Sequence, residues 1–491
     1  MRIQNPILWS DYPDPDLIRV ADAYYMVTTT MFFMPGGPIM KSYDLVHWQI
    51  VSYIFDKLEG YDNVGTGYGR GQWATSLRAH DGMFYAFFTC LDQGKSYLYY
   101  TDNIERSNWE HVEFDTPYHD ASLLFDDDGT CYLIYNCGDV RIARFTPDMH
   151  ALCDDAPLFS TPKEGIALRC EGCRAMKKDG YYYLFFIDIP AGGIRRELCY
   201  RSKTIQGPYE VRVIANSMCA ANNRGVAQGM PVDTPEGDWY MILFGDHGAV
   251  GRIPYLFPLS WEDGWPVVGA GEGMRLNYET PLCSRGSNLP VRSDSFCHEE
   301  NRLGLYWQWN HNPDDSAWSF TERPGWLRLH AAPAQELMRA RNTLSQRTCG
   351  PGCSFTVELD AAALVPGARA GLAALQYDCA MIGVEAGPGG RMRVFTRRRD
   401  AVRTGEAGPE YELTSMPVPA GPIFLRAQFD FRDRQDTVRF FCSTDGVNWQ
   451  MQGKAVPLHF NLRYFVGTRA ALYCYGGGFA DFRNFTAQIE E

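Results

Sequence analysis

The sequence lacks any apolar run long enough to cross a membrane, and the residues after Met1 contain no apolar stretch typical of a secretion signal. It also lacks an excess of positive charge, because 46 lysines and arginines stand against 59 aspartates and glutamates, for a formal net charge of −13. This balance disfavours nucleic acid and anionic membranes as partners and favours neutral or cationic ligands. We therefore expect a cytoplasmic protein with no membrane or nucleic-acid partner.

The fifteen cysteines lack the spacing of a disulfide framework, and their number is odd. We expect free, buried thiols in a reducing compartment. Cys170 and Cys173 form one isolated Cys-x-x-Cys pair, and neither a second pair nor histidines at a fitting spacing complete a zinc site. A metal or redox role for this pair is therefore the lesser alternative.

With 491 residues, the chain is too long for one ordinary core, and two large domains are expected. In the first half, one phrase recurs five times: a small or acidic residue, Gly or Asp, two variable residues, Tyr and an apolar run. The copies are Ala21-Asp22-x-x-Tyr25, Asp81-Gly82-x-x-Tyr85, Asp128-Gly129-x-x-Tyr132, Asp179-Gly180-x-x-Tyr183 and Glu236-Gly237-x-x-Tyr240. Each copy reads as a hairpin turn entering an aromatic strand, and no helical pattern lies between them. A repeat of this period predicts a β-propeller of five blades with about four strands each.

The same register points to a site. Twelve residues before each repeat tyrosine, or eleven in the first copy, stand Asp14, Trp73, Asp120, Glu171 and Gln228. Because the first strand of each propeller blade lines the central channel, these five positions should converge near one axis. Three carboxylates, a flat aromatic and an amide there are typical of a pocket that hydrolyses sugars.

Hydrolysis of a glycosidic bond needs one protonated carboxyl and one ionised carboxylate on opposite sides of the anomeric carbon. A third carboxylate helps, because its charge raises the pKa of the acid. Asp14, Asp120 and Glu171 can supply these roles. Glu171 stands between two cysteines, so partial burial would raise its pKa, as an acid requires.

Each candidate also has a plainer interpretation. Asp14 could open a strand between its two prolines, and Asp16, two residues further on, is a rival expected on the same face. Asp120 could cap a strand, and Trp73 fits a core position as well as a sugar platform. His247 is one of ten histidines, most of which are structural when they stand alone.

The repeat ends after Gly273, and a polar connection that includes Ser284-Arg-Gly-Ser-Asn288 follows. From about residue 300 onward, short alternating strands and turn signals predict two packed antiparallel sheets. We therefore expect an all-β chain, with a propeller over residues 1–280, a linker near 275–295 and a β-sandwich over 296–491.

Several motifs together resemble glycoside hydrolase family 43, across both halves of the chain. They are Asn5-Pro-Ile-Leu8, Tyr12-Pro-Asp-Pro15, Ser42-x-Asp-Leu-Val-His-Trp48, His119-Asp-x-Ser-Leu-x-Phe-Asp-Asp127, Glu171-Gly, Gln228-Gly229, Asp246-His-Gly-x-x-Gly-Arg252 and, in the second half, Leu305-x-Trp-Gln-Trp-Asn-His-Asn-Pro313. The second-half motifs are similar to the concanavalin-like or jelly-roll-like sandwich of the β-xylosidase branch.

The resemblance implies an inverting mechanism, in which Asp14 is the general base, Glu171 the general acid, and Asp120 the group that orients the acid and modulates its pKa. It also implies that Trp73 lines the sugar pocket and that Arg252 contacts substrate and base, whereas Gln228 is a candidate for binding substrate from the repeat register. His247 matches a histidine on the propeller axis that in some members helps to hold a calcium ion or a water. Members often form oligomers, and a sandwich loop often closes the pocket; Tyr473–Phe479 is the candidate here.

Two segments depart from the family pattern. Cys173-Arg174 stand where relatives commonly have a small residue and histidine, and Gln228-Gly-Met-Pro231 replaces a more usual glycine-rich run. If Arg174 approached Glu171, its positive charge would lower the pKa of the acid and weaken catalysis.

The expected function is release of pentose units from oligosaccharides derived from plant polysaccharides, as an exo-acting β-xylosidase. The alternatives are an α-L-arabinofuranosidase, a dual-specificity enzyme, or a non-catalytic sugar-binding protein on the same scaffold. We expect no cofactor to be required for this chemistry. Binding of calcium and formation of a homo-oligomer are open alternatives. We predict carboxyl groups of Asp14 and Glu171 about 6.5–9.5 Å apart, the inverting range.

Overall fold

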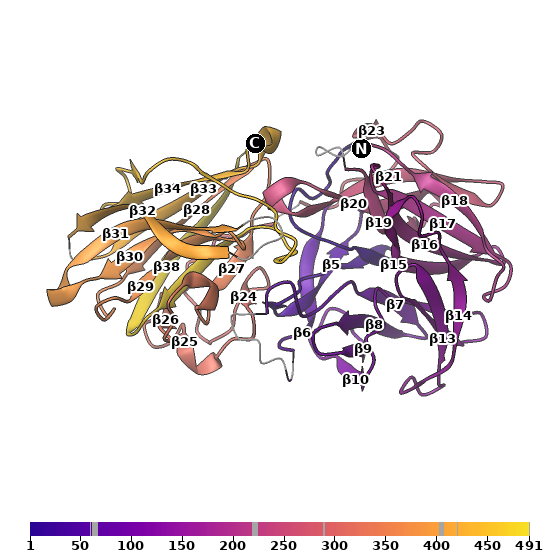
Figure 1. Ribbon diagram of the computed structural model, residues 1–491, viewed down its shortest axis with the longest axis horizontal. Coiled ribbons are helices and arrows are strands. Elements are labelled where there is room, and N and C mark those ends of the chain that lie inside the picture. The colour runs from indigo at the N-terminus through magenta and orange to yellow at the C-terminus, as the bar shows by residue number, and fades with distance from the viewer. Residues whose placement is uncertain are drawn as a thin grey trace.

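The computed structural model describes residues 1–58, 60, 67–218, 224–287, 290–401, 407–419 and 421–490, so Asn288 of the polar connection lies outside the described residues. Within these ranges, five four-stranded antiparallel sheets make up the first half of the chain (Figure 1). The strands of blades one to three are β2 (Asp16–Val20), β3 (Ala23–Val27), β5 (Gly36–Ser42), β6 (Gln49–Phe55); β7 (Ser76–His80), β8 (Met83–Cys90), β9 (Lys95–Thr101), β10 (Glu110–Phe114); and β11 (Ser122–Phe125), β12 (Cys131–Tyr135), β13 (Asp139–Phe145), β14 (Leu152–Ser160). Blades four and five are β15 (Ile166–Lys178), β16 (Tyr181–Pro190), β17 (Arg196–Ser202), β18 (Glu210–Ala215); and β19 (Val226–Asp233), β20 (Trp239–Asp246), β21 (Arg252–Glu262), β22 (Trp265–Val268).

The predicted five-bladed propeller is confirmed. All five repeat tyrosines lie on the second strand of a blade, directly after the hairpin turn. Asp81-Gly82 and Asp179-Gly180 both adopt the left-handed backbone that a tight hairpin turn requires, with φ between 48° and 77°. The first strands contact one another in a ring, in the order β2, β7, β11, β15, β19 and back to β2. Equivalent positions on these strands therefore do face one axis.

The ring is closed by contacts between its first and last blades. Arg19 of β2 donates two hydrogen bonds to Asp233 of β19, at 2.9 and 2.6 Å. Beyond blade five, β23 (Asn277–Glu279) pairs with β1 (Arg2–Gln4), which fastens the start of the chain to the end of the propeller. Blades packed on both faces need continuous apolar strands, and Tyr183-Leu-Phe-Phe186 is buried throughout.

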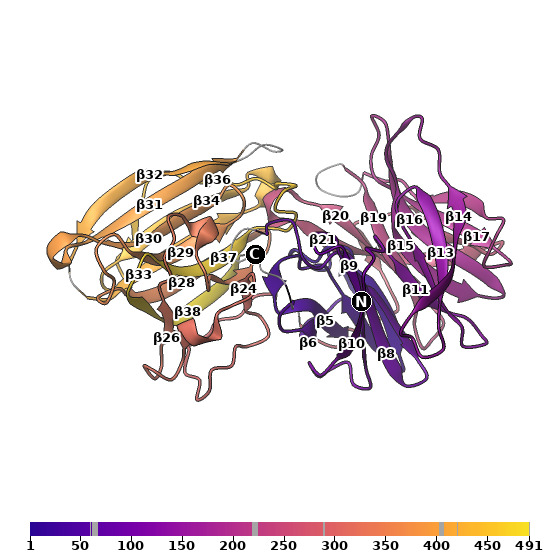
Figure 2. The same cartoon turned by 60° about the horizontal axis from the view of Figure 1, so that its bottom comes forward.

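The second half forms a sandwich of two sheets (Figure 2). One sheet has the order β32 (Ala407–Val418), β31 (Met392–Ala401), β30 (Ala380–Ala386), β29 (Arg369–Leu375), β37 (Arg469–Tyr475), β27 (Leu344–Arg347), β24 (Gln308–Asn310), β4 (Phe33–Met34). The other has β25 (Trp318–Ser319), β26 (Leu327–His330), β38 (Phe479–Glu490), β28 (Gly352–Asp360), β33 (Ile423–Asp430), β34 (Thr437–Ser443), β35 (Gln450–Met451), with β36 (Val456–Pro457) beside β34. Strand β4 comes from blade one, so the propeller supplies the edge of a sandwich sheet, which no sequence pattern predicted.

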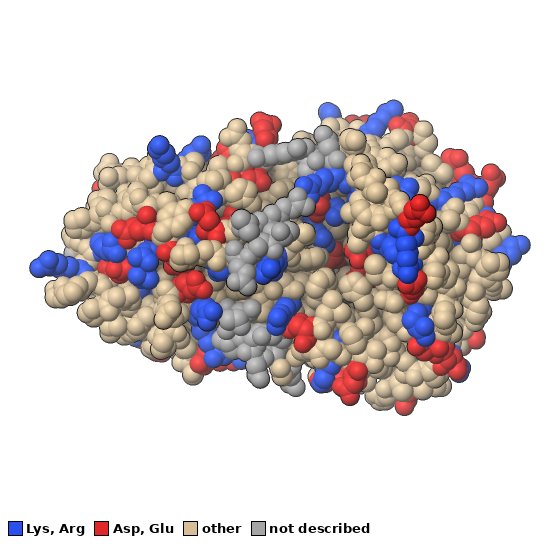
Figure 3. Space-filling view, viewed as in Figure 1, with Lys and Arg blue, Asp and Glu red and all other residues tan. Residues whose placement is uncertain are grey.

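The only helices among the described residues are short 3₁₀ turns: η1 (Gly248–Val250), η2 (Asp315–Ala317), η3 (Leu337–Arg339), η4 (Pro388–Gly390) and η5 (Arg432–Arg434). In the same part of the chain, no helix has the length and apolar character needed to span a membrane. The fourteen described cysteines are free thiols, and ten of them are buried; Cys283 and Cys297 are exposed, so the expectation of buried thiols holds only in part. Cys219 lies outside the described residues. Charged side chains of both signs are interspersed over both domains on the face shown in Figure 3.

Candidate active site

The five register positions lie where the inner strands begin or bend. Asp14, Trp73 and Asp120 lie two or three residues before the first residue of β2, β7 and β11, whereas Glu171 and Gln228 lie within β15 and β19. The pairing of β15 with β16 shifts register on both sides of Glu171, and that of β19 with β20 shifts next to Gln228. Such bulges turn a side chain away from the regular alternation of a strand, here toward the channel.

The backbone is strained at the same positions. Asp14, Asp120 and Gln228 adopt left-handed conformations with φ of 55°, 47° and 60°, which are uncommon for residues other than glycine. Each costs on the order of 1–3 kcal/mol and persists only where the surroundings enforce it. Gly172 also has a left-handed φ of 67°, and a Cβ there would lie 2.6 Å from the Gln228 side chain. The neighbour of Glu171 must therefore be a glycine.

Glu171 and Asp120 share one side of the site with His119. The Nε2 atom of His119 lies 3.7 Å from Asp120 Oδ2 and 3.9 Å from Glu171 Oε2. Asp120 Oδ2 accepts a hydrogen bond of 2.9 Å from the Gly172 amide, which fixes it beside the Glu171 backbone. The Glu171 side chain is 25% exposed and that of Asp120 only 8%, so Glu171 is the carboxyl that a substrate can reach.

His119 and Asp120 shift each other's pKa. Burial raises the pKa of Asp120 to about 6, with the charges of Glu171 and Asp14 adding to it and that of His119 opposing it. Burial favours the neutral ring of His119, but Asp120, Glu171 and Asp14 together raise its pKa to about 9. At neutral pH a protonated imidazole therefore sits between two carboxyl groups.

Asp14 is held by a chain of alternating charges. Arg252 Nη1 donates a 2.8 Å hydrogen bond to Asp14 Oδ1, and Arg252 Nε lies 3.5 Å from Asp246 Oδ1. Asp246 in turn accepts a 3.1 Å hydrogen bond from Arg195. The guanidinium carbons of Arg195 and Arg252 lie 4.9 and 4.8 Å from the centre of the Phe244 ring. Burial would raise the pKa of Asp246, but the two arginines hold it below its usual value.

Arg174 makes its hydrogen bonds with backbone carbonyls, two of them beside Asp14. It is fully buried and donates to the backbone carbonyls of Asp14 at 2.8 Å and of Pro15 at 3.3 Å. Its Nε also lies 3.6 Å from Asp16 Oδ1. Arg174 thus joins the strand that carries Glu171 to the backbone that carries Asp14.

Asp16 is not an alternative to Asp14, which corrects the expectation that both point to one face. Its side chain is completely buried, pairs with Arg78 at 2.8 Å and accepts the Leu77 amide at 2.9 Å. The alternation of a strand does not extend back from Asp16, because Asp14 lies before β2 in a left-handed conformation. Asp16 joins blades one and two instead.

The sandwich covers the site, but with a different segment from the one expected. Tyr473–Tyr475 ends β37 with its side chains buried, so Tyr473–Phe479 does not close the pocket. The segment over the site is 458–467, which we call the capping segment. Its Phe465 ring lies 5.1 Å from the Trp73 ring and 4.3 Å from the Arg252 guanidinium. Trp73 also contacts His119 edge to face at 5.9 Å, so it belongs to the pocket and to a packed cluster at once.

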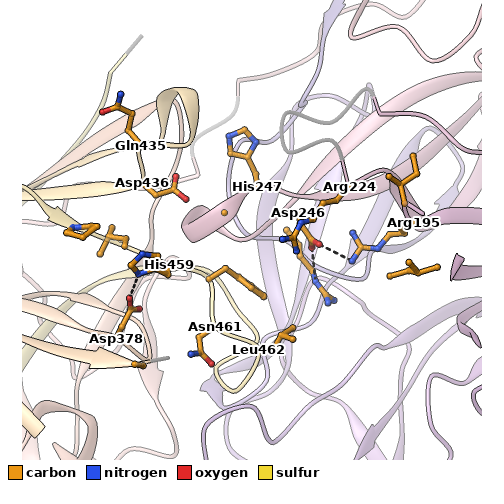
Figure 4. Close-up of a pocket in the computed structure, with 18 of the residues that line it drawn as sticks. Arg195, Arg224, Asp246, His247, Asp378, Gln435, Asp436, His459, Asn461 and Leu462 are labelled. Carbon is orange, nitrogen blue, oxygen red and sulfur yellow. Dashed lines mark hydrogen bonds and ion pairs between the residues drawn. The ribbon is translucent and has the colours of Figure 1, made fainter. Parts of the chain in front are cut away.

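A chamber of about 950 Å³ opens beside the site, between propeller and sandwich (Figure 4). Its lining includes Arg195, Asp246, His247 and Arg252 from the propeller, and Asp436 and His459 from the sandwich. Arg252 therefore faces both Asp14 and the chamber. His247 lies at the chamber wall, where its ring packs edge to face on Trp9 at 5.1 Å.

Among the described residues that line the chamber with His247, the carboxylates of Asp246 and Asp436 are already engaged by other partners. Calcium takes six to eight oxygen ligands, yet Asp246 is engaged by two arginines and Asp436 accepts the Ala249 amide at 2.7 Å. Among the described residues, the trio with ligand atoms close enough for a metal is His119, Asp120 and Glu171, and His247 is not part of it. No step is derived through an ion here.

Sequence reasoning missed His119, Phe465, Asp246 and Arg195. His119 stands next to Asp120 in the sequence, and that adjacency was an available signal. Asp246 lies in the same motif as Arg252, six residues earlier. For Phe465 and Arg195 no local pattern exists, because their partners lie in other blades or in the other domain.

Comparisons with known proteins agree with this geometry. The model of glycosyl hydrolases family 43 matches residues 3–266, and that of the β-xylosidase C-terminal concanavalin A-like domain matches residues 293–488. A protein of Xylanibacter ruminicola is 35% identical over 356 residues, covering 69% of this chain and 65% of the relative.

Two solved structures are similar along the whole chain. A bifunctional GH43-CE protein of Bacteroides eggerthii shares 38% identity with a TM-score of 0.92, covering 100% of this chain and 64% of that protein. An engineered GH43 hydrolase with both endo-xylanase and exo-arabinofuranosidase activity shares 28% identity with a TM-score of 0.90, covering 100% and 99%. The chain thus spans about two thirds of the length of the Xylanibacter ruminicola and Bacteroides eggerthii proteins.

Proposed function

Because the chain belongs to glycosyl hydrolase family 43, we propose that it is an inverting, exo-acting glycosidase that releases xylose from the ends of oligosaccharides. One observation carries the proposal: Glu171 shares a cluster with Asp120 and His119, whereas Asp14 is paired with Arg252. Paired carboxyls in such different surroundings suit an acid and a base.

In the proposed reaction, the Asp14 carboxylate removes a proton from a water molecule as its oxygen attacks the anomeric carbon. The bond to the leaving oxygen breaks, and Glu171 gives that oxygen its proton. Asp120 and His119 lie beside Glu171 and orient its carboxyl group. Arg252 orients the carboxylate of Asp14. One attack from the side opposite the leaving group inverts the anomeric centre.

The surroundings support an exo-acting enzyme. Trp73 and Phe465 form an aromatic wall over the site, of the kind on which sugar rings stack. We assign the site beside this wall to the terminal sugar and the adjoining chamber to the leaving part of the oligosaccharide, with Arg252 between the two.

The choice of sugar rests on the β-xylosidase-type sandwich domain, matched over residues 293–488. The second candidate is an α-L-arabinofuranosidase or an enzyme with both activities, favoured by the likeness to the engineered hydrolase with exo-arabinofuranosidase activity.

The test is hydrolysis of aryl β-D-xyloside and aryl α-L-arabinofuranoside by the wild type, with Asp14→Ala as the control. Turnover of the xyloside with release of α-xylose, lost in the variant, supports the proposal. Retained anomeric configuration would overturn the inverting mechanism, and preference for the arabinofuranoside would select the second candidate.

A further inference from the structure

Asp11 is a buried carboxylate at the junction of the two domains, and the hydrolytic mechanism above does not use it. It is 2% exposed and lies three residues before Asp14. Its Oδ1 accepts the backbone amide of Arg252 at 2.9 Å, and its Oδ2 accepts the backbone amide of Gly467 at 2.9 Å. One carboxylate therefore binds the propeller with one oxygen and the sandwich with the other.

Both partners lead directly to the active site. The Arg252 side chain holds Asp14 at 2.8 Å. Gly467 ends the capping segment, two residues after Phe465, whose ring covers the Arg252 guanidinium at 4.3 Å. The base, its arginine and the aromatic cover thus depend on two hydrogen bonds to a single side chain.

The backbone is shaped to let Asp11 in. A Cβ on Gly251 would lie 2.1 Å from Asp11 Oδ1, and a Cβ on Gly467 would lie 2.9 Å from Asp11 Cβ. Both positions therefore need glycine for close approach. Alongside, the Thr468 amide donates to the Ala249 carbonyl at 2.9 Å, so the end of the capping segment is fastened to the turn before Arg252.

Opposing influences act on the charge of Asp11: burial raises its pKa, whereas Arg469, the amides of Gly467 and Arg252, and Arg347 favour the ionised form that can accept from both amides. Arg347 donates from Nε to the backbone carbonyl of Asp11 at 2.9 Å, and Arg347 and Arg469 are 3% and 1% exposed. Two buried cations need a nearby anion. An asparagine would remove that charge and would set an amide donor against one of two backbone donors.

We propose that Asp11 is a positioning residue that sets the capping segment and Arg252 in register, so that the sandwich completes the active site through this one carboxylate. The inference rests on the proposed glycosidase reaction but not on which sugar is released. It predicts that loss of Asp11 disturbs catalysis through geometry, although Asp11 does not touch the reacting atoms.

The first test is Asp11→Asn, measured on each aryl glycoside that the wild type hydrolyses. We expect kcat/KM to fall about 100-fold, because displacement of a catalytic arrangement by about 1 Å has that effect. Amide hydrogen exchange in residues 458–467 should become faster. In a Phe465→Ala background, the further loss caused by Asp11→Asn should be much smaller, because both changes disturb the same contact.

Asp44→Asn is the matched control. Asp44 is 1% exposed, and its carboxylate accepts the backbone amides of His47 at 2.8 Å and Arg285 at 2.6 Å, none of which touches the site. This variant should lose stability but keep kcat/KM within about twofold per folded molecule, with unchanged exchange in the capping segment.

The inference is overturned if Asp11→Asn folds with the kcat/KM and the exchange of the wild type, or if its loss simply multiplies with that of Phe465→Ala. If Asp11→Asn does not fold, Gly467→Ala decides, because its Cβ would lie 2.1 Å from the Val250 carbonyl and displace the same junction. Wild-type kinetics and exchange in that variant would also overturn it. A wild type inactive on both glycosides would count against the proposed sugar, while the exchange comparison still decides the role of Asp11.

Discussion

The two sides of the active site hold charge in different ways. Around Glu171, an imidazole and two carboxyl groups lie within 4.8 Å of one another; burial raises the pKa of Asp120 to about 6, and the surrounding carboxylates raise that of His119 to about 9. Around Asp14, arginines and aspartates alternate, and arginine does not lose its proton in proteins. We call the Glu171 side mobile, because Asp120 and His119 change protonation between about pH 6 and 9, and the Asp14 side fixed, because its arginines keep their protons.

The largest expected effects are losses of activity in Glu171→Gln and Asp14→Ala. Only the loss in Glu171→Gln should depend on the leaving group of the substrate. Glu171→Gln should lower kcat/KM on xylo-oligosaccharides by about 10²–10⁴-fold, because it cannot donate a proton. On an aryl glycoside whose leaving group needs no protonation, the loss should be much smaller. Steady-state kinetics with both substrates measure this difference.

Asp14→Ala should instead lose activity about equally on both substrates, because water must be activated whatever leaves. Equal losses in Glu171→Gln would contradict the acid role, and a leaving-group dependence in Asp14→Ala would contradict the base role. Circular dichroism of both variants checks that the fold is kept.

A second prediction concerns a mutation in the chain of charges that holds Asp14. Asp246→Asn removes the anion between Arg195 and Arg252, and the released Arg252 no longer holds Asp14 in one orientation. We expect kcat/KM to fall by about 10–100-fold on every substrate. Asp233→Asn is the control, because Asp233 also pairs with an arginine, at 2.6 Å, but joins blades one and five away from the site. Comparable losses in both variants would mean that the effect is general destabilisation.

The sequence predicted the propeller because a blade is local: two hairpins within about 50 residues, with the turn and its tyrosine at a constant place. The same regularity led from the tyrosines to Asp14, Trp73, Asp120, Glu171 and Gln228. Local periodicity also has limits. Asp16 was misplaced because strand alternation was extended back through a left-handed residue, Asp14, where it does not apply.

What lies between the domains could not be predicted in the same way. Strand β4 joins the sandwich although it comes from blade one, and Phe465 meets Trp73 nearly 400 residues away in the chain. Neither segment has a motif of its own, since its role depends on which distant surface it reaches. Arg174 was known only as a charge near Glu171, and its partners became visible only when the bulged strand placed it under Asp14.

A third prediction tests the mobile side. With the pKa of Asp120 at about 6 and that of His119 at about 9, kcat/KM should rise with pH through about 6 and fall above about 9. The His119 cation lowers the pKa of Asp120, so His119→Asn should move the acidic limb to higher pH by about one unit. His150→Asn, at an exposed histidine, should leave the profile unchanged. An acidic limb that stays in place or moves down would contradict the coupling.

The smallest effect concerns stability. The pKa of His119 is about 9 in the folded protein and 6.5 without these surroundings, so protonation stabilises the fold fully below pH 6.5. This contribution is lost as the pH rises through 9. Protonation of Asp120 also stabilises the fold, but that contribution is lost as the pH rises through its raised pKa of about 6. Between pH 6.5 and 9 the free energy of unfolding of the wild type should therefore fall by on the order of 2 kcal/mol more than that of His119→Asn. Urea denaturation of both proteins across this range measures the difference, and parallel curves would show that His119 is not held as a cation.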